Sequence, residues 1–385
     1  MESNQLLTPI RSESLELAKQ TMLHRAKSWI AGLYHRYEQY TGIAIFGLGF
    51  IWDSLTMTRV DNMIDNVILL FYLIIIAAMI ILTLWRQSGR ILPGWIQKLE
   101  PRFLWAMQWC FGGLFSSYVI FYFRSASWTR TQFFFLILVF LWIGNEFLEH
   151  RLQNPELLSV LYCFCLFSFL AFFLPVILAK VSTWIFVLAG FISLVISLSV
   201  FGAGMLAEGR KQRRRMISIA AWICSTFLTV NILYFANLIP PVPLALKSAG
   251  IYHEVVRTPT GYAVKYVPPS WLKFWRKWDD PFYLSPGEIV YCYTAIFAPG
   301  KVRVPVNHVW SHKTMDGWVQ TDRIRFEIAG GREGGYRGFT KKNGIVPGDW
   351  RVEVETERGQ ILGRIDFKVS ISLSPHPLMR TALIR

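Results

Sequence analysis

The sequence predicts an α-helical polytopic membrane bundle of about seven transmembrane helices, followed by an all-β immunoglobulin-like sandwich domain. Three observations favour this fold class. Long apolar runs fill the chain up to about residue 246, the apolar periodicity changes from helical to two from Glu288 onward, and a basic run separates the last two apolar segments. With 385 residues the chain is long enough for more than one domain.

Residues 1–40 are predicted to form a cytoplasmic amphipathic tail. No apolar core follows a basic start, so a cleavable signal peptide is not expected. Apolar side chains recur at helical spacing between basic ones, as in Met22, Ala26, Trp29 and Leu33. This pattern is typical of a helix that lies on a membrane surface. A solvated helix that packs on the bundle is the alternative.

Residues 41–240 are predicted to form the transmembrane bundle. A helix needs roughly 20 apolar residues to cross the hydrocarbon core. We expect spans at about 42–58, 66–85, 104–123, 131–148, 157–178, 184–206 and 216–238. Pro175 is expected to kink or end the fifth span.

The distribution of basic residues predicts the orientation of these spans. With a cytoplasmic amino terminus, the inner segments carry 15 Lys and Arg and the outer loops carry 4. The strongest single signal is the expected loop with Arg210, Lys211, Arg213, Arg214 and Arg215. Because basic loops stay on the cytoplasmic side, we expect a multi-pass protein of the bacterial inner membrane with a periplasmic carboxy-terminal domain. An error of one span would move that domain to the other side.

Residues 241–287 are predicted to be a linker and aromatic collar, residues 288–373 the β-sandwich, and residues 374–385 a tail. Pro240, Pro241 and Pro243 stop the last helix. Period-two alternation marks strands at 302–311, 323–328, 350–355 and 361–371. The turn Glu357–Gln360 predicts an antiparallel hairpin between the last two strands. Six or seven short strands separated by turn signals favour an immunoglobulin-like sandwich.

Aromatic and glycine positions follow one another in a characteristic order in the last third of the chain, in the stretches His308–Trp310, Gly335–Lys342, Gly348–Val354 and Gly363–Val369. In this order they resemble a bacterial family known as domain of unknown function 2914. The segment Trp52–Asp61 is similar to the first-span segment of membrane-anchored members. The family has no assigned activity, so the resemblance implies an architecture and adds no chemistry.

The sequence assigns no metal, cofactor or catalytic residue. His308 and His312 are predicted to be structural, because zinc needs three or four converging ligands. The glycine-rich stretch Gly330–Gly335 lacks the Lys-Ser/Thr of a phosphate-binding loop and is predicted to be a turn. Cys292 is the one cysteine outside the apolar segments, so the β-sandwich is expected to fold without a disulfide.

A basic, aromatic stretch of the β-sandwich is the best binding candidate. Residues 250–385 contain 20 Lys and Arg against 13 Asp and Glu, a surplus of seven. The candidate residues are Arg332, Tyr336, Arg337, Phe339, Lys341 and Lys342. Such side chains suit an anionic envelope ligand or a partner protein, and a solvated basic loop is the alternative. Nucleic acid is not expected, because no nucleic-acid-binding motif is present.

Polar residues in and near the spans are candidates for a role within the bilayer. These are Asp53, Arg59, Asp61, Asn145 and Glu146. Ionisable groups at membrane depth mark functional sites by default, and ion pairing at helix ends is the structural alternative. The favoured function is therefore a non-catalytic binding or structural module of the cell envelope. A transporter or membrane-embedded enzyme, and an envelope sensor that depends on a partner, are the alternatives.

Overall fold

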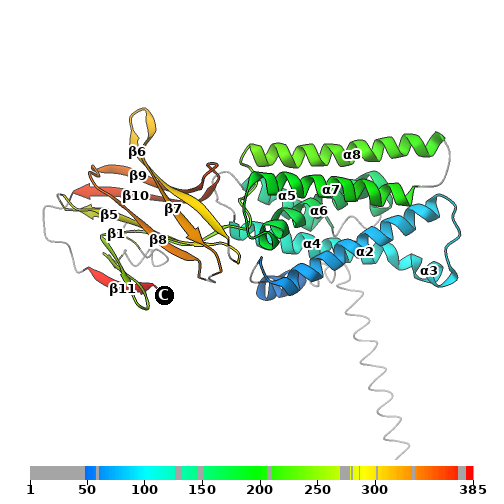
Figure 1. Ribbon diagram of the computed structural model, residues 1–385, viewed down its shortest axis with the longest axis horizontal. Helices are drawn as coiled ribbons and strands as arrows, with labels where there is room; N and C mark the ends of the chain where they lie inside the picture. Colours follow the sequence, from blue (N-terminus) through cyan, green and yellow to red (C-terminus); the bar gives the residue numbers. More distant parts are fainter. Residues whose placement is uncertain are drawn as a thin grey trace, which may run out of the picture. The chain divides into compact units, whose positions relative to one another are not determined.

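The computed structural model describes residues 48–57, 60–125, 132–145, 151–205, 210–268, 278, 281–285, 287–300, 302–331, 334–371 and 379–384. The chain divides into two units, Met1–Thr56 and Met57–Arg385. In the first unit, the described residues 48–56 are helical. The helices and strands that follow, labelled in Figure 1, all belong to the second unit by their residue numbers.

Helices occupy the first half of the second unit. They are α2 (Met63–Gln87), α3 (Gly94–Leu99), η1 (Glu100–Arg102), α4 (Phe103–Ser125), α5 (Gln132–Asn145), η2 (Arg151–Gln153), α6 (Pro155–Ile177), α7 (Thr183–Gly204) and α8 (Arg210–Phe235). Polar caps define where the apolar runs begin. The Asn62 side chain accepts a hydrogen bond from the Ile64 amide at 3.1 Å, and Asn154 accepts one from Glu156 at 2.9 Å. Such caps satisfy amides that have no partner within the helix.

Five of these helices are long and apolar enough to cross a membrane, which is typical of a membrane protein. They are α2, α4 over Phe103–Phe123, α6, α7 and α8 over Arg213–Phe235. Helix α6 is central, since 72% of its apolar span is buried against 22% for α8. Large apolar side chains on α2, α7 and α8 face outward, among them Phe71, Phe191 and Leu228. An apolar outer surface of this kind suits a lipid surrounding.

Two of the expected spans are described only in part. Within 131–148, the described helix α5 has 14 residues, fewer than a crossing needs, and residues 146–150 lie outside the described part. Of the expected span 42–58, residues 48–56 are seen as helix and residues 42–47 are not described. The expected loop Arg210–Arg215 is instead the start of α8. A helix can continue beyond the hydrocarbon core, because its backbone hydrogen bonds do not depend on the solvent.

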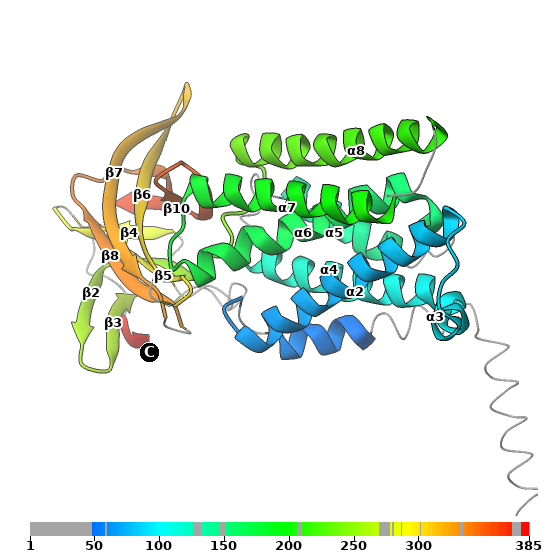
Figure 2. The same ribbon diagram turned by 45° about the vertical axis from the view of Figure 1, so that its right-hand side comes forward.

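Strands fill the second half of the unit. They are β1 (Ala245–Tyr252), β2 (Glu254–Thr258), β3 (Gly261–Tyr266), β4 (Phe282–Leu284), β5 (Val290–Phe297), β6 (Arg303–Thr314), β7 (Gly317–Ala329), β8 (Tyr336–Lys342), β9 (Gly348–Thr356), β10 (Ile361–Ile371) and β11 (Arg380–Ile384). They form sheets with the orders β1-β5-β8, β4-β10-β9-β6-β7 and β11-β3-β2. In Figure 2 the hairpin of β2 and β3 lies next to the C-terminal strand.

The three-stranded sheet β1-β5-β8 is covered on both faces. On one face, Ile251 and Cys292 share a buried cluster with Trp310, Trp350 and Phe367 of the five-stranded sheet. On the other face, aromatic side chains pack against the small sheet β11-β3-β2.

Strand β1 lies within the range that the sequence assigns to the linker. Its ladder with β5 is interrupted between Leu246 and Ser248, and buried residues follow one another at its end, so its sequence lacks a period of two.

The hairpin between β9 and β10 has the antiparallel pairing that the sequence predicts. Ile365 lies opposite Val352 and Phe367 opposite Trp350, and these four side chains are buried. On the outer face, Arg351 Nε lies 2.6 Å from Asp366 Oδ1, and Arg364 pairs with Glu353. Cross-strand pairs between opposite charges support this register.

Candidate functional site

The predicted binding residues lie on or next to β8, and the alternation of the strand divides them between two faces. Tyr336 packs against the buried cluster that contains Val304. The Lys342 ammonium pairs with Asp322 and lies 5.3 Å from the centre of the Trp350 ring. Both side chains therefore pack toward the five-stranded sheet. Arg332 lies outside the described residues.

The remaining three residues are on the opposite face of β8. Phe339 is 6.2 Å from the Tyr262 ring, within the cluster under the small sheet. Lys341 is exposed, with its ammonium 5.4 Å from the centre of the Tyr291 ring. Arg337 is half-buried. Of this set, Lys341 is thus an exposed cation and Arg337 a half-buried one, and both lie on the face of β8 that is turned toward the sheet β11-β3-β2.

His308 joins the five-stranded sheet to the sheet β1-β5-β8. Its Nδ1 lies 2.8 Å from the hydroxyl of Thr340, and its Nε2 lies 3.0 Å from the hydroxyl of Thr294. The side chain is fully buried, and burial lowers the pKa of His308 to about 3. The imidazole is therefore neutral, with one nitrogen donating and the other accepting. No group of three His, Cys, Asp or Glu in the described parts of the chain is placed to hold a metal ion.

The polar residues predicted in and near the spans do not form one cluster among the described residues. Asn145 is buried, and it exchanges hydrogen bonds with Gln108: each side-chain amide donates to the other residue's carbonyl at 3.0 Å. The Asp61 carboxylate accepts a hydrogen bond from the Gly300 amide at 3.3 Å. Asp53 is half-buried and lies in the first unit. Arg59 and Glu146 lie outside the described residues.

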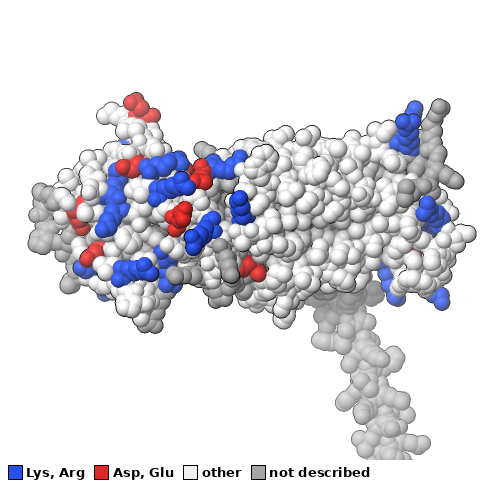
Figure 3. All heavy atoms as spheres, in the orientation of Figure 1, with Lys and Arg blue, Asp and Glu red and all other residues white. Residues whose placement is uncertain are grey.

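The basic run expected to set the topology occupies the first turns of α8. The side chains of Arg213 and Arg214 are exposed and that of Arg215 is half-buried, while those of Arg210 and Lys211 are not described. In Figure 3 the visible middle of the helical part carries no charged side chain, and Lys and Arg gather at its right-hand end.

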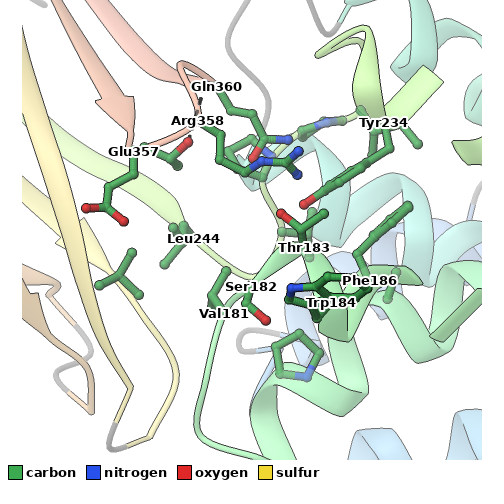
Figure 4. A pocket seen from close by; sticks show the side chains of 18 of the residues that line it. Val181, Ser182, Thr183, Trp184, Phe186, Tyr234, Leu244, Glu357, Arg358 and Gln360 are labelled. Carbon is green, nitrogen blue, oxygen red and sulfur yellow. Dashed lines mark hydrogen bonds between the residues drawn. The ribbon is translucent and has the colours of Figure 1, made fainter. Parts of the chain in front are cut away.

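A pocket of about 320 Å³ lies where the helices meet the β9–β10 hairpin. We call it the junction pocket. It is lined by the residues just before α7 and its first two residues (Val181–Trp184), by Tyr234 and the segment after α8, and by Thr356–Arg358 with Gln360. Figure 4 shows Arg358 and Gln360 reaching from the hairpin toward Tyr234. Sequence reasoning did not find this pocket.

The walls of the junction pocket differ in character. One wall is aromatic, because the Phe186 and Tyr234 rings stack with their centres 3.7 Å apart. Opposite it, the Arg358 guanidinium lies 5.1 Å from the centre of the Tyr234 ring. The Gln360 side chain is buried, and its Nε2 has no hydrogen-bond partner among the described residues. Such a pocket suits a group that has hydrogen-bond acceptors and negative charge beside an apolar part.

No curated protein matches the chain. Among solved structures, a similarity is found to the Pseudomonas fluorescens alkylpurine DNA glycosylase AlkC bound to DNA containing an abasic site analog. It covers 81% of this chain and 99% of that chain at 10% identity, with a TM-score of 0.21. A TM-score this low carries no argument about fold or function.

The family comparison concerns the β region. Residues 304–369 match the family described as Protein of unknown function (DUF2914). The matched segment runs from β6 to β10 and contains most of the motifs on which the resemblance was based. This match confirms the resemblance, and it identifies residues 304–369 as the DUF2914 region of the chain.

Proposed function

We propose that this chain is an integral protein of the bacterial inner membrane that presents a basic, immunoglobulin-like β-sandwich on the periplasmic side. In this proposal about seven helices form the anchor, the amino terminus is cytoplasmic, and the β-sandwich is a non-catalytic binding or structural module of the cell envelope. The observation that carries it is the series of five long apolar helices followed by a β region with many Lys and Arg on its surface (Figure 3).

The ends of α8 support this orientation. Exposed Arg213 and Arg214 mark its beginning, and the chain passes into β1 shortly after its end at Phe235. Basic residues next to a span favour the cytoplasmic side. One crossing by α8 then carries the β region to the periplasm.

A topology reporter tests the orientation. Alkaline phosphatase fused after Arg385 is expected to be active and green fluorescent protein at the same site dark, because the first folds in the periplasm and the second in the cytoplasm. The opposite result would reverse the orientation. Recovery of the full chain in the soluble fraction would remove the membrane part of the proposal.

Arg337 and Lys341 of β8 are the proposed contacts to an anionic envelope ligand or partner protein. We expect that Arg337→Glu combined with Lys341→Glu reduces co-sedimentation of the full chain with lipopolysaccharide by about tenfold, because two favourable charge contacts become repulsive. Arg257→Glu combined with Lys313→Glu changes the net charge equally at exposed positions on β2 and β6 and is the matched control. Equal effects of both pairs would argue against a local site.

A further inference from the structure

We infer that the junction pocket binds the phosphate-bearing head group of an anionic membrane lipid, with Arg358 and Gln360 as the groups that hold the phosphate. The inference deepens the proposed function, and it rests on the proposal that the helices cross a membrane. Three features of the described residues support it: an unmatched charge, an unmatched donor, and the position of the pocket at the helix ends.

The charge of Arg358 is not neutralised by its neighbour in the hairpin. Glu357 is engaged elsewhere, since its Oε1 lies 2.6 Å from Arg325 Nη2. No carboxylate in the described parts of the chain forms an ion pair with Arg358. Its guanidinium is held instead over the rings of Tyr234 and Phe235, at 5.1 and 5.4 Å from their centres. A guanidinium stacked on aromatic rings keeps its N–H groups available for bidentate contact with phosphate oxygens.

Gln360 supplies a donor in the same wall. Its side chain is more than nine-tenths buried, and its Nε2 lacks a hydrogen-bond partner among the described residues. The backbone on either side of it is fixed: the Gln360 amide donates to Thr356 Oγ1 at 3.2 Å, and its carbonyl accepts from the Thr356 amide at 3.0 Å. A buried donor without a partner is unfavourable. A phosphate oxygen in the pocket would satisfy it.

The position of the pocket favours a lipid over a soluble anion. Helix α6 ends at Ile177, α7 begins at Thr183 and α8 ends at Phe235, so three apolar helices end beside it. Spans of this kind leave the hydrocarbon core at the level of the lipid head groups. Trp184 lines the pocket and is 82% exposed, as is typical of tryptophans at the membrane interface.

The apolar surface next to the pocket fits acyl chains. Ile177 at the end of α6, Leu178 directly after it and Leu188 one turn beyond Trp184 on α7 are exposed. A lipid with its phosphate at Arg358 would lay its chains on this surface. A free phosphate would leave both the surface and the aromatic wall of Phe186 and Tyr234 unused.

Native mass spectrometry of the detergent-purified full chain with phosphatidylglycerol tests the inference. The wild type is expected to retain phosphatidylglycerol in preference to phosphatidylcholine, and Arg358→Glu to weaken this binding by about tenfold, as expected for the loss of a hydrogen bond to a charged group. Gln360→Leu should weaken it by a smaller factor. Arg257→Glu, an equal charge change on exposed β2, should leave it unchanged.

A second variant keeps the test decisive if Arg358→Glu does not fold. Thr183→Trp adds bulk to the lining without changing charge and is expected to displace the lipid. Undiminished phosphatidylglycerol binding in a folded Arg358→Glu or Thr183→Trp chain would overturn the inference. Complete displacement of the lipid by glycerol phosphate at equal concentration would also overturn it, because a soluble phosphate would then suffice.

The two proposals fail in different ways. A chain that fractionates with membranes and carries a periplasmic reporter, but whose lipid preference does not depend on Arg358, leaves the proposed function intact and removes the lipid site. A chain recovered in the soluble fraction removes both.

Discussion

The Nδ1 atom of His308 lies 2.8 Å from the hydroxyl oxygen of Thr340, so β6 of the five-stranded sheet is hydrogen-bonded to β8 of the sheet that faces it. The other ring nitrogen bonds to Thr294 on β5 at 3.0 Å. A polar bridge inside an apolar sandwich requires all of its members, because each unmatched nitrogen or hydroxyl would be buried without water.

Removing one hydroxyl should therefore destabilise the sandwich. Thr340→Val is expected to lower the free energy of unfolding by about 1–3 kcal/mol, the cost of leaving a buried nitrogen unpaired. Thr381→Val on exposed β11 is the control and should change it by less than about 0.5 kcal/mol. Denaturant titration of the full chain in detergent measures both. Equal losses would show that the bridge contributes nothing specific.

The same bridge predicts a dependence of stability on pH. Burial lowers the pKa of His308 from 6.5 to about 3. Between these values the unfolded chain binds a proton at this residue and the folded chain does not. Stability is therefore complete above about pH 6.5 and falls as the pH decreases toward 3. The difference in unfolding free energy between the wild type and His308→Gln should shrink over this interval, by at most about 1.4 kcal/mol per pH unit. A constant difference would show that His308 is not buried in its neutral form.

How much the sequence could predict depends on whether an element has one buried face or two. In β9 and β10 one face is buried, and alternation alone identifies Trp350, Val352 and Phe367 as inward-facing. β1 has buried residues on successive positions, Ile251 and Tyr252, because packed layers lie on both sides of its sheet. A period of two then disappears from the sequence.

The candidate sites show the same limit. Lys341 and Lys342 are neighbours in sequence and were expected to act together, but consecutive strand residues face opposite sides. That rule could be applied from the sequence once β8 was recognised as a strand.

The junction pocket could not be predicted from the sequence, because it joins Val181–Trp184 to a hairpin far away in the sequence. The available signal was an arginine at the tip of a hairpin, which is an ordinary surface residue in most proteins.

Two tryptophans on adjacent strands provide a test of the core. Trp310 is fully buried between the sheets. Trp318 is partly exposed, and the Arg351 guanidinium lies 4.0 Å from the centre of its ring. Trp310→Ala is expected to lower the unfolding free energy by about 3–5 kcal/mol, and Trp318→Ala by about 0.5–1 kcal/mol. Denaturant titration distinguishes them. A small loss at Trp310 would mean that the two sheets are not packed face to face around it.

Alanine substitutions at two glycines with positive φ allow the cost of backbone strain to be measured apart from the cost of a steric clash. Gly335, before β8, has φ +83°, and Gly359, in the β9–β10 hairpin, has φ +76°. A Cβ at Gly359 would meet nothing within 4 Å, whereas one at Gly335 would lie 2.9 Å from the backbone of Ile296 on β5.

Both alanine variants should therefore lose about 1–2 kcal/mol, the cost of the left-handed conformation. Gly335→Ala should lose more, because strand β5 is packed on both faces and its backbone cannot shift without disturbing the sheets. Denaturant titration of the two variants, with the wild type as reference, measures how much more unfolding free energy Gly335→Ala loses than Gly359→Ala. Equal losses would show that β8 can move away from β5 at this point, and the pairing of Ile296 with Tyr336 would then be looser than the register indicates.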